Sequence, residues 1–322
     1  MAKLVVKGGK MICGTHRVAG NKNAALPMIA ASLLTSDSVT ITNLPDIDDV
    51  ALMLEVAKGF GVKVARNLKK DSVTLVAGKI RTAKIDPGLA AMLNRMGAKV
   101  RGAGTNLIVI DGVDSLHGCT ARVGCDYIEA GSYITAAAVT GGELTLTGID
   151  PVPFGVMEGP FARFGVTWSI DAEKGELHYV PRKRLKMKYD LGDAIPSVAD
   201  GTWPAFPSDL LSILIVLATQ TRGTCLFFEK MFESRLYFVD HLKQMGAKIV
   251  QCDPHRVVVT GPSPLVGGTV TSPDIRAGIA LVIAALCAKG ETVILNAESI
   301  DRGYVAVEKS FVALGANIVR TA

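Results

Sequence analysis

Charged and amide side chains stand at the expected starts of several apolar helices in this sequence. The stretch VAGNKNAALPMIAAS, residues 18–32, places Lys22 and Asn23 directly ahead of an apolar run. Asparagine is a good N-cap, and Pro27 is tolerated within a first turn. A lysine at this end opposes the helix dipole, which costs about a few tenths of a kcal/mol. The position favours an anionic partner for Lys22, and a solvated lysine is the alternative.

An aspartate begins the most apolar helix that the sequence predicts. In PAFPSDLLS, residues 204–212, Asp209 directly precedes a long aliphatic run. Ser208 or Asp209 could serve only as the N-cap of this helix. A carboxylate at the edge of an apolar element could instead be a general base with a raised pKa. The residues alone leave both alternatives open.

Three arginines bring positive charge to comparable places. Arg235 lies inside the aromatic run FESRLYF. The others stand in SPDIRAG and SIDRGYV, just before two expected helices, and form the pairs Asp274–Arg276 and Asp301–Arg302. An arginine there suits a phosphate or carboxylate, because backbone N–H groups and the guanidinium point at the same anion. A local Asp–Arg ion pair is the alternative at each place.

A repeated pattern accounts for the apolar positions between these residues. Each unit has a helix rich in small residues, a β run, an amphipathic helix ending in glycine, and a further strand or hairpin. The glycines that end the amphipathic helices are Gly61, Gly97, Gly165, Gly246 and Gly315, which lie 36, 68, 81 and 69 residues apart. The short first interval predicts that part of the array is missing between about residue 77 and residue 87. A family with uneven units is the alternative.

Composition restricts the class of protein. A chain of 322 residues, 49% hydrophobic and 20% charged, suits two globular domains. The net charge is +5, and the densest basic run is PRKRLKMK, residues 181–188. Its alternation of basic and apolar residues predicts a strand with one wet face rather than a nucleic-acid site, since no aromatic platform accompanies it.

Cysteine usage and hydropathy indicate the compartment. The six cysteines form no CxxC pair and no close Cys/His spacing, so we expect no zinc site, and scattered free thiols fit a reducing cytoplasm. The N-terminal residues contain no apolar signal region. The most apolar run, LLSILIVLA at 210–218, is about half the length that a bilayer requires. We expect a buried helix there and no membrane partner.

Six stretches of the chain resemble one enzyme family. GNKNAALPMIAASLLT, NLPDIDDV, FPSDLLS, FESRLYFV, SPDIRAG and SIDRGYVAVEK occur in the order found in the UDP-N-acetylglucosamine enolpyruvyl transferases, which are relatives of EPSP synthase. The similarity extends over nearly the whole chain. The resemblance implies an α/β (α+β) fold of two domains, each built of three βαβαββ units around a pseudo-threefold axis, with the substrate between them.

The resemblance also implies a reaction. The enolpyruvyl group of phosphoenolpyruvate moves to the 3-hydroxyl of UDP-N-acetylglucosamine and phosphate is released. This is the first committed step of peptidoglycan synthesis and takes place in the cytoplasm. No metal ion or organic cofactor is implied, and the oligomeric state is left open.

Roles for individual residues follow from the same resemblance. Lys22 and Asn23 match a lysine–asparagine pair that contacts phosphoenolpyruvate and the sugar, and Arg302 would hold phosphoenolpyruvate together with Lys22. Asp209 matches the aspartate near the attacking hydroxyl, the candidate general base. Met231 matches a position whose backbone contacts the UDP-sugar. The other matches are polar residues of the cleft, namely Arg235, Asp274 and Arg276.

One loop of the family has no counterpart in this sequence. That loop, close to PGGCxIGxRP, supplies a cysteine or aspartate that protonates the methylene carbon, and an arginine for the donor; none of the six cysteines lies in such a context. The missing segment is about 100 residues, or one and a half repeat units. We therefore expect a first domain, 21–124, of about one and a half units, and a complete second domain, 1–20 with 125–322.

The missing loop keeps two other functions open. One is a catalytically impaired or inactive relative that binds a ligand or a partner. The other is an enolpyruvyl transferase with a different acceptor. Half a unit cannot bury its own apolar face, and an uncovered face favours dimerisation or aggregation.

Overall fold

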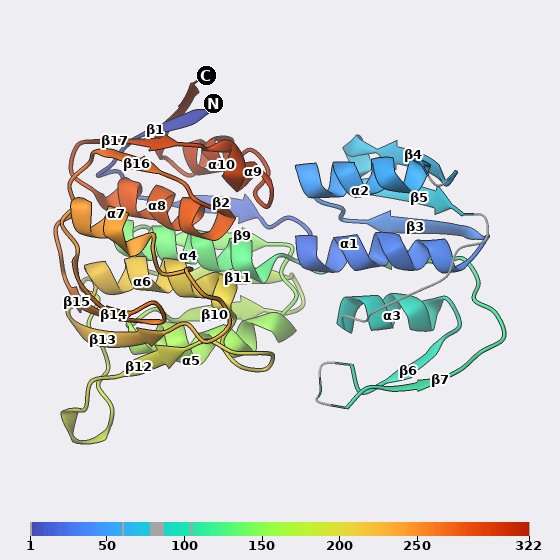
Figure 1. The fold of residues 1–322 in the computed structure, drawn as a ribbon, viewed down its shortest axis with the longest axis horizontal. Coiled ribbons are helices and arrows are strands. Elements are labelled where there is room, and N and C mark those ends of the chain that lie inside the picture. Colours follow the sequence, from blue (N-terminus) through green and yellow to red (C-terminus); the bar gives the residue numbers. More distant parts are fainter. Residues whose placement is uncertain (1, 60, 78–86, 104, 106, 322) are drawn as a thin grey trace. The chain divides into compact units, whose positions relative to one another are not determined.

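A computed structural model describes residues 2–59, 61–77, 87–103, 105 and 107–321. The chain divides into two compact units, each with its own core (Figure 1). Unit 1 is Met1–Val18 with Tyr127–Ala322, and unit 2 is Ala19–Asp126. The predicted position of the missing segment, about 77–87, falls almost wholly outside the described residues.

Unit 1 contains three βαβαββ repeats, and each repeat forms one four-stranded sheet. The first repeat comprises β2 (Gly14–Arg17), α4 (Tyr127–Thr140), β9 (Leu144–Thr147), α5 (Gly155–Arg163), β10 (Trp168–Asp171) and β11 (Glu176–Tyr179). The second comprises β12 (Ser197–Ala199), α6 (Leu211–Gln220), β13 (Gly223–Phe228), α7 (Val239–Gln244), β14 (Lys248–Asp253) and β15 (Arg256–Gly261). The third comprises β16 (Thr269–Thr271), α8 (Ile275–Cys287), β17 (Glu291–Leu295), α10 (Val307–Ala313), β18 (Asn317–Thr321) and the N-terminal strand β1 (Lys3–Lys7).

The three sheets share one strand order and one set of directions. The orders are β2-β9-β11-β10, β12-β13-β15-β14 and β16-β17-β1-β18. In each sheet the first two strands are parallel and the remaining neighbours are antiparallel. Short helices lie between these elements: η3 (Val152–Phe154), η4 (Leu191–Asp193), η5 (Ser208–Leu210) and α9 (Glu298–Asp301).

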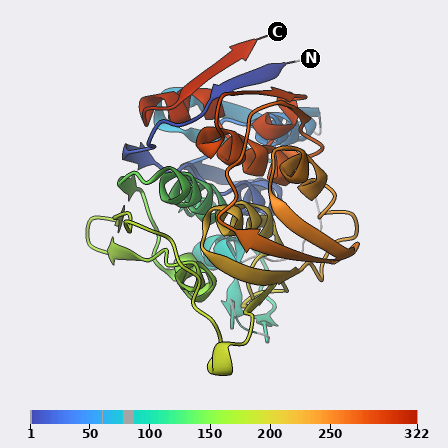
Figure 2. The ribbon, with the colours of Figure 1, turned by 90° about the vertical axis from the view of Figure 1, so that its left-hand side faces the viewer.

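The core of unit 1 is formed by the three small-residue helices α4, α6 and α8, which pack against one another. Figure 2 shows these helices nearly end-on, with the strands outside them. Close packing requires glycine at two places. A Cβ on Gly131 would lie 2.8 Å from Leu210 Cδ2, and one on Gly278 would lie 2.3 Å from Ser272 Oγ. The aliphatic run at 210–218 lies within this core, as the sequence predicts.

The five glycines that end the amphipathic helices adopt the left-handed conformation. Their φ values run from +81° at Gly165 to +102° at Gly246. Glycine reaches this conformation without the steric cost that a Cβ would impose, so each helix ends where the sequence predicts.

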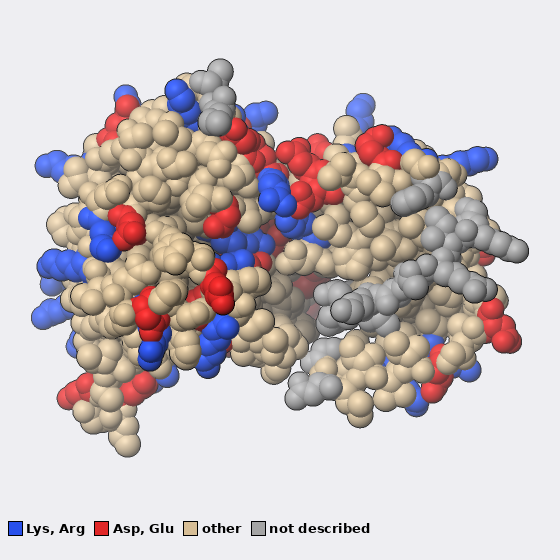
Figure 3. All heavy atoms as spheres, viewed as in Figure 1, with Lys and Arg blue, Asp and Glu red and all other residues tan. Residues whose placement is uncertain are grey.

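One predicted strand is absent from the described structure. The basic run 181–188 contains a single β-bridge, Lys186 with Arg222, and no strand. Met187 is buried while Lys186 and Lys188 are exposed, so the alternation is kept without a ladder. The strand prediction for this run is therefore wrong, because only one residue finds a pairing partner. On the face of unit 1 drawn in Figure 3, lysine and arginine lie side by side with aspartate and glutamate.

Unit 2 contains one complete repeat and part of another. The complete repeat is β8 (Thr120–Arg122), α1 (Lys22–Ala31), β3 (Ser38–Thr42), α2 (Asp48–Gly59), β4 (Lys63–Asn67) and β5 (Ser72–Val76), with strand order β4-β5-β3-β8. The short helices η1 (Ser32–Leu34) and η2 (Leu68–Lys70) follow α1 and β4. The partial repeat is α3 (Pro87–Arg95), β6 (Lys99–Arg101) and β7 (Val109–Asp111), where β6 and β7 form a two-stranded sheet.

The partial repeat exposes apolar side chains. The exposed residues at and beside β7 are Leu107, Ile108, Val109, Ile110 and Val113. Within the described part of the chain, no third strand pairs with β6 or β7. An apolar strand with a free edge is a site for pairing with another chain.

We expect that Ile110→Thr reduces self-association of the protein, because threonine keeps β propensity while removing apolar surface. Sedimentation velocity over a range of protein concentrations measures the effect. Val319→Thr in β18 is the matched control, since Val319 is 55% exposed and Ile110 is 54% exposed. Equal sedimentation of the two variants and the parent chain would contradict the prediction.

Candidate functional site

A carboxylate between two guanidinium groups forms the most polar cluster among the predicted residues. Asp209 lies in η5, directly before α6. Its Oδ1 accepts a hydrogen bond from Arg235 Nη1 at 2.7 Å, and its Oδ2 lies 2.7 Å from Arg276 Nη2. Arg235 Nη1 also donates to Ser208 Oγ at 3.3 Å. Two arginines from separate segments therefore meet at one carboxylate.

The start of α8 positions Arg276. Asp274 is the N-cap, and its Oδ1 accepts hydrogen bonds from Arg276 N at 2.7 Å and Ala277 N at 3.0 Å. Ser212 in the first turn of α6 donates to the Arg276 carbonyl at 3.0 Å. The first turns of α6 and α8 are thereby tied together, and the Arg276 side chain is buried where it meets Asp209.

An aromatic ring positions Arg235. The guanidinium carbon of Arg235 lies 4.3 Å from the centre of the Phe232 ring, a distance typical of cation–π contact. Met231, directly before this ring, has an exposed side chain, and its backbone N–H donates to Glu229 Oε1 at 3.0 Å. The segment after β13 therefore carries both Met231 and Arg235.

The two arginines keep Asp209 ionised. Burial raises the pKa of Asp209. The charge of Arg276 and the hydrogen bond and charge of Arg235 lower the pKa by more than burial raises it, so the pKa lies below its ordinary value. The expectation of a raised pKa for this carboxyl group is wrong. The N-cap alternative is wrong as well, because Pro207 occupies the N-cap of η5 and makes no side-chain capping bond.

Lys22 and Asn23 lie in unit 2, at the start of α1. Lys22 Nζ is 2.9 Å from Asp49 Oδ2 in the first turn of α2, so the alternative of a solvated lysine is wrong. The N-cap is Asn21, whose side-chain oxygen accepts from Ala24 N at 3.0 Å, while Asn23 is exposed. The sequence did not lead us to predict Asp49 as the partner of Lys22 or Asn21 as the N-cap. Asp49 lies in the motif NLPDIDDV, and Asn21 lies in GNKN.

Arg302 lies in a different setting from the one predicted. It is the C-cap of α9, which packs against α8, and α10 begins only at Val307. The Asp301–Arg302 pair therefore does not directly precede a helix, because four residues with no regular helix separate it from α10. Asp301 instead binds Arg320 through both carboxylate oxygens, at 2.7 and 2.9 Å. Arg302 remains a predicted site residue of unit 1.

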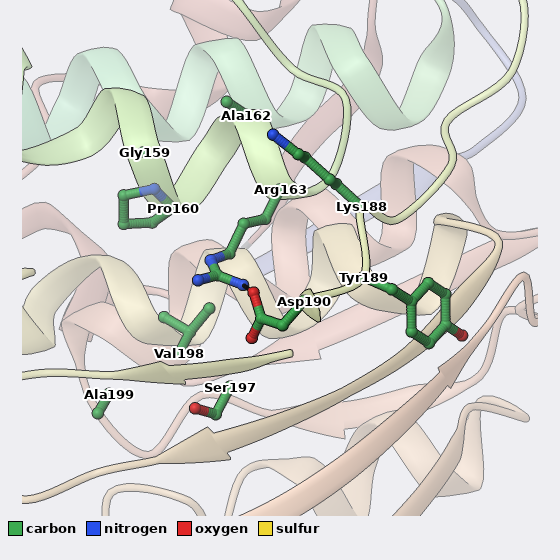
Figure 4. A pocket seen from close by; sticks show the side chains of 10 residues that line it. All are labelled: Gly159, Pro160, Ala162, Arg163, Lys188, Tyr189, Asp190, Ser197, Val198 and Ala199. Atoms are coloured by element: carbon green, nitrogen blue, oxygen red, sulfur yellow. Dashed lines mark hydrogen bonds and ion pairs between the residues drawn. The ribbon is translucent and has the colours of Figure 1, made fainter. Parts of the chain in front are cut away.

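A separate cavity of about 540 Å³ lies beside α5 and the strand β12 (Figure 4). Arg163 Nη1 and Asp190 Oδ1 form an ion pair at 2.6 Å on its wall, and Lys188 and Tyr189 belong to the same lining. None of the predicted site residues lines this cavity.

The described part of the chain contains neither a candidate metal site nor a candidate membrane-spanning helix. Over the described residues, no three His, Cys, Asp or Glu side chains gather as a metal site would require. Nor is any described helix long and apolar enough to cross a membrane. All six cysteines are free thiols, and burial raises the pKa of Cys119, the first thiol after the partial repeat.

We expect Asp209→Asn to lower the free energy of unfolding by about 2 kcal/mol at pH 7, because two guanidinium groups lose a carboxylate partner in a largely buried place. A carboxyl group with a lowered pKa stabilises the fold above its unfolded pKa and loses this contribution as the pH falls through the folded value. The difference between the parent chain and the variant should therefore shrink at about pH 3. Denaturant unfolding of both proteins at pH 7 and at about pH 3 measures this difference in the free energy of unfolding.

Asp253→Asn is the matched control for this experiment. Asp253 also pairs with an arginine, Arg256, at 2.6 Å, but the pair lies on the surface, where solvent screens it. A loss of stability as large as that of Asp209→Asn would contradict the special role of the buried cluster.

Comparison with known proteins identifies the family. The family model described as EPSP synthase (3-phosphoshikimate 1-carboxyvinyltransferase) matches residues 6–88 and 85–311. The UDP-N-acetylglucosamine 1-carboxyvinyltransferase of Borrelia garinii is 36% identical over 423 aligned residues, and that of Treponema denticola is 34% identical over 424. Each alignment covers 99% of this chain and 99% of the relative.

Solved structures share the fold. The enolpyruvyl transferase NikO from Streptomyces tendae has a TM-score of 0.82 and 20% identity, with 99% of each chain covered. EPSP synthase from Acinetobacter baumannii has a TM-score of 0.73 and 15% identity, with 99% of each chain covered. At these identities the likeness concerns the fold.

The alignments with relatives are longer than this chain. The alignment with the Borrelia garinii protein runs over 423 positions and this chain has 322 residues, so at least 101 aligned positions have no counterpart here. The two matches of the family model meet at residues 85–88, beside the interval in which the glycine spacing predicts a missing segment. With a family-model match over most of its length and relatives above 30% identity over 99% of it, the chain belongs to the EPSP synthase family, among the UDP-N-acetylglucosamine 1-carboxyvinyltransferases.

Proposed function

We propose that this protein transfers the enolpyruvyl group of phosphoenolpyruvate to the 3-hydroxyl of UDP-N-acetylglucosamine and releases phosphate, the first committed step of peptidoglycan synthesis. The names of its relatives support this reaction. The observation that carries the proposal is the cluster of Asp209 with Arg235 and Arg276, in which a base and two anion-binding groups occur together. The six free thiols fit a cytoplasmic location.

The predicted residues receive roles on chemical grounds. Lys22 and Arg302 bind the phosphate or carboxylate of phosphoenolpyruvate, as preorganised cations stabilise charge that develops in a transition state. Asn23 and the Met231 backbone contact the UDP-sugar. Asp274 keeps Arg276 in place through the helix start. Asp209 accepts the proton of the 3-hydroxyl.

The reaction requires Asp209 to gain basicity when substrates bind. In the structure, both of its oxygens face arginines, which hold its pKa below the ordinary value. A substrate anion that draws Arg235 or Arg276 away removes this stabilisation and raises the pKa of Asp209. The sugar oxygen then bonds to C2 of the donor, C3 takes up a proton, and loss of phosphate with loss of one C3 proton restores the double bond.

We further propose that unit 2 is the family's first domain, predicted as 21–124 and reduced to about one and a half repeats, and that unit 1 is its second. The lack of a counterpart for at least 101 aligned positions favours a second candidate function. Without the loop that carries the proton donor, the protein would bind one or both substrates and not turn them over. An enolpyruvyl transferase with another acceptor remains an outcome of the same assay.

We expect phosphate release that needs both phosphoenolpyruvate and UDP-N-acetylglucosamine and falls by at least about 100-fold in Lys22→Ala, since a preorganised charge next to the reacting group is lost. A coupled phosphate assay measures the rate. Lys58→Ala is the control, because Lys58 is a surface lysine of α2 that pairs with Glu55 in the same helix.

Three outcomes separate the candidates. Release that depends on both substrates supports the transferase. Binding of UDP-N-acetylglucosamine by calorimetry without release supports the non-catalytic relative. Release with phosphoenolpyruvate and a different hydroxyl acceptor, but none with the UDP-sugar, contradicts the proposed acceptor.

A further inference from the structure

Two buried carboxyl groups lie side by side at the ends of parallel strands in unit 1. Strands β12 and β13 are paired so that Ala199 lies opposite Phe228. The next residue on each strand is acidic: Asp200 is 2% exposed and Glu229 is fully buried. Neither was predicted as a functional residue, and no arginine or lysine forms an ion pair with either one among the described residues.

Each carboxyl group uses one oxygen to hold the backbone that follows β13. Asp200 Oδ1 accepts from Lys230 N at 2.5 Å. Glu229 Oε1 accepts from Met231 N at 3.0 Å and from Phe232 N at 3.1 Å. Three consecutive backbone N–H groups are therefore held by two side chains.

The second oxygens of the two groups accept no hydrogen bond from any described residue. Asp200 Oδ2 and Glu229 Oε2 are buried and unpaired among the described residues. Two adjacent ionised carboxylates would repel each other in a place that water does not reach, and both oxygens would stay unsatisfied. One proton between the groups removes the repulsion and supplies the missing hydrogen bond. Consistently, burial and then the neighbouring Asp200 raise the pKa of Glu229 to about 8.

The charged side chains around Asp200 and Glu229 have other partners and do not neutralise the two carboxyl groups. His255 Nδ1 lies 2.9 Å from the Glu229 carbonyl oxygen, not from its carboxyl group. Lys230 and Arg256 lie over the Phe228 ring, at 5.3 and 5.7 Å from its centre. Asp253 binds Arg256 and the His255 backbone N–H.

The two acids begin the two segments that carry the candidate site. From Asp200 the chain runs to Asp209, and from Glu229 it runs to Arg235; the segments meet again at the Asp209–Arg235 ion pair. We propose that Asp200 and Glu229 hold one proton between them and so anchor both segments, acting as positioning residues for Asp209 and Arg235. The positioning role rests on the proposed function, whereas the shared proton does not.

A cycle of amide substitutions tests the shared proton. In Glu229→Gln the amide oxygen still accepts from Met231 and Phe232, and the NH₂ group donates to Asp200; in Asp200→Asn the NH₂ group donates to Glu229. Either single variant replaces the proton. In the double variant two NH₂ groups face each other without an acceptor. We expect both single variants to keep the parent melting temperature at pH 7 or exceed it, and the double variant to melt at least about 3 °C below either one.

The pH dependence of the same measurement has a definite sign. A folded pKa of about 8 against 4.5 in the unfolded chain means that the folded state holds the proton more tightly. The stability from this group is fully present below pH 4.5 and is lost as the pH rises to about 8. Glu229→Gln does not lose this stability. The difference in melting temperature between Glu229→Gln and the parent chain should therefore increase in favour of the variant from pH 5 to pH 8. Additive effects in the cycle, or a difference that does not change with pH, would overturn the proposal.

Trp203 reports the positioning role without any substrate. It lies in the segment between Asp200 and Asp209. The chain has one other tryptophan, Trp168. In a Trp168→Phe background, the emission maximum of Trp203 should shift with a midpoint near pH 8 and stay constant in Glu229→Gln, although His255 is present in both. An unchanged midpoint in Glu229→Gln would overturn the role. Failure of the phosphate assay would affect neither readout, so the two proposals fail separately.

Discussion

The mutual packing of α4, α6 and α8 is the constraint on which the rest of unit 1 depends. Helices α4 and α6 approach closely because Gly131 of α4 has no Cβ, which would lie 2.8 Å from Leu210 Cδ2 and 3.5 Å from Ile213 Cδ1 at the start of α6. Burial of the three helices brings the starts of α6 and α8 together, and the Ser212 bond to the Arg276 carbonyl holds that arrangement. Asp209 and Arg276 meet for this reason, although 66 residues lie between them in the chain.

The protonation of the buried carboxyl groups in unit 1 depends on the cations beside them, because water has limited access to these groups. An aspartate at the edge of an apolar helix would gain a proton more readily if it stood alone, yet two guanidinium groups outweigh burial and keep it charged. Asp200 and Glu229 show the opposite case: no cation among the described residues pairs with either carboxyl group, and the pKa of Glu229 rises to about 8. Two carboxyl groups of unit 1 therefore differ in protonation because their partners differ.

Unit 2 shows what an incomplete repeat does to a fold of this kind. In the complete repeat, α1 and α2 cover the sheet. The edge strand β8 of this sheet comes from the C-terminal part of the unit. Among the described residues, the sheet of the partial repeat contains two strands, β6 and β7, and Ile110 is 54% exposed. Because a repeat buries its apolar face against a neighbour, loss of the neighbour leaves apolar surface. The two matches of the family model meet at residues 85–88, at the start of this partial repeat.

Local sequence signals determined the elements and their ends: five glycines with positive φ, the small-residue helices, the short interval in the array and the family motifs. They also marked Asp209 and Arg276 as polar residues at apolar helices, and Arg235 as a cation within an aromatic run. Tertiary structure decided what these residues touch: Lys22 binds Asp49, Asp301 binds Arg320, and Asp209 takes two arginines rather than capping a helix. Capping and periodicity act within one or two turns, and the sequence carries them directly. Ion pairs, pKa values and the Asp200–Glu229 contact join segments that only packing brings together, so no local pattern could reveal them.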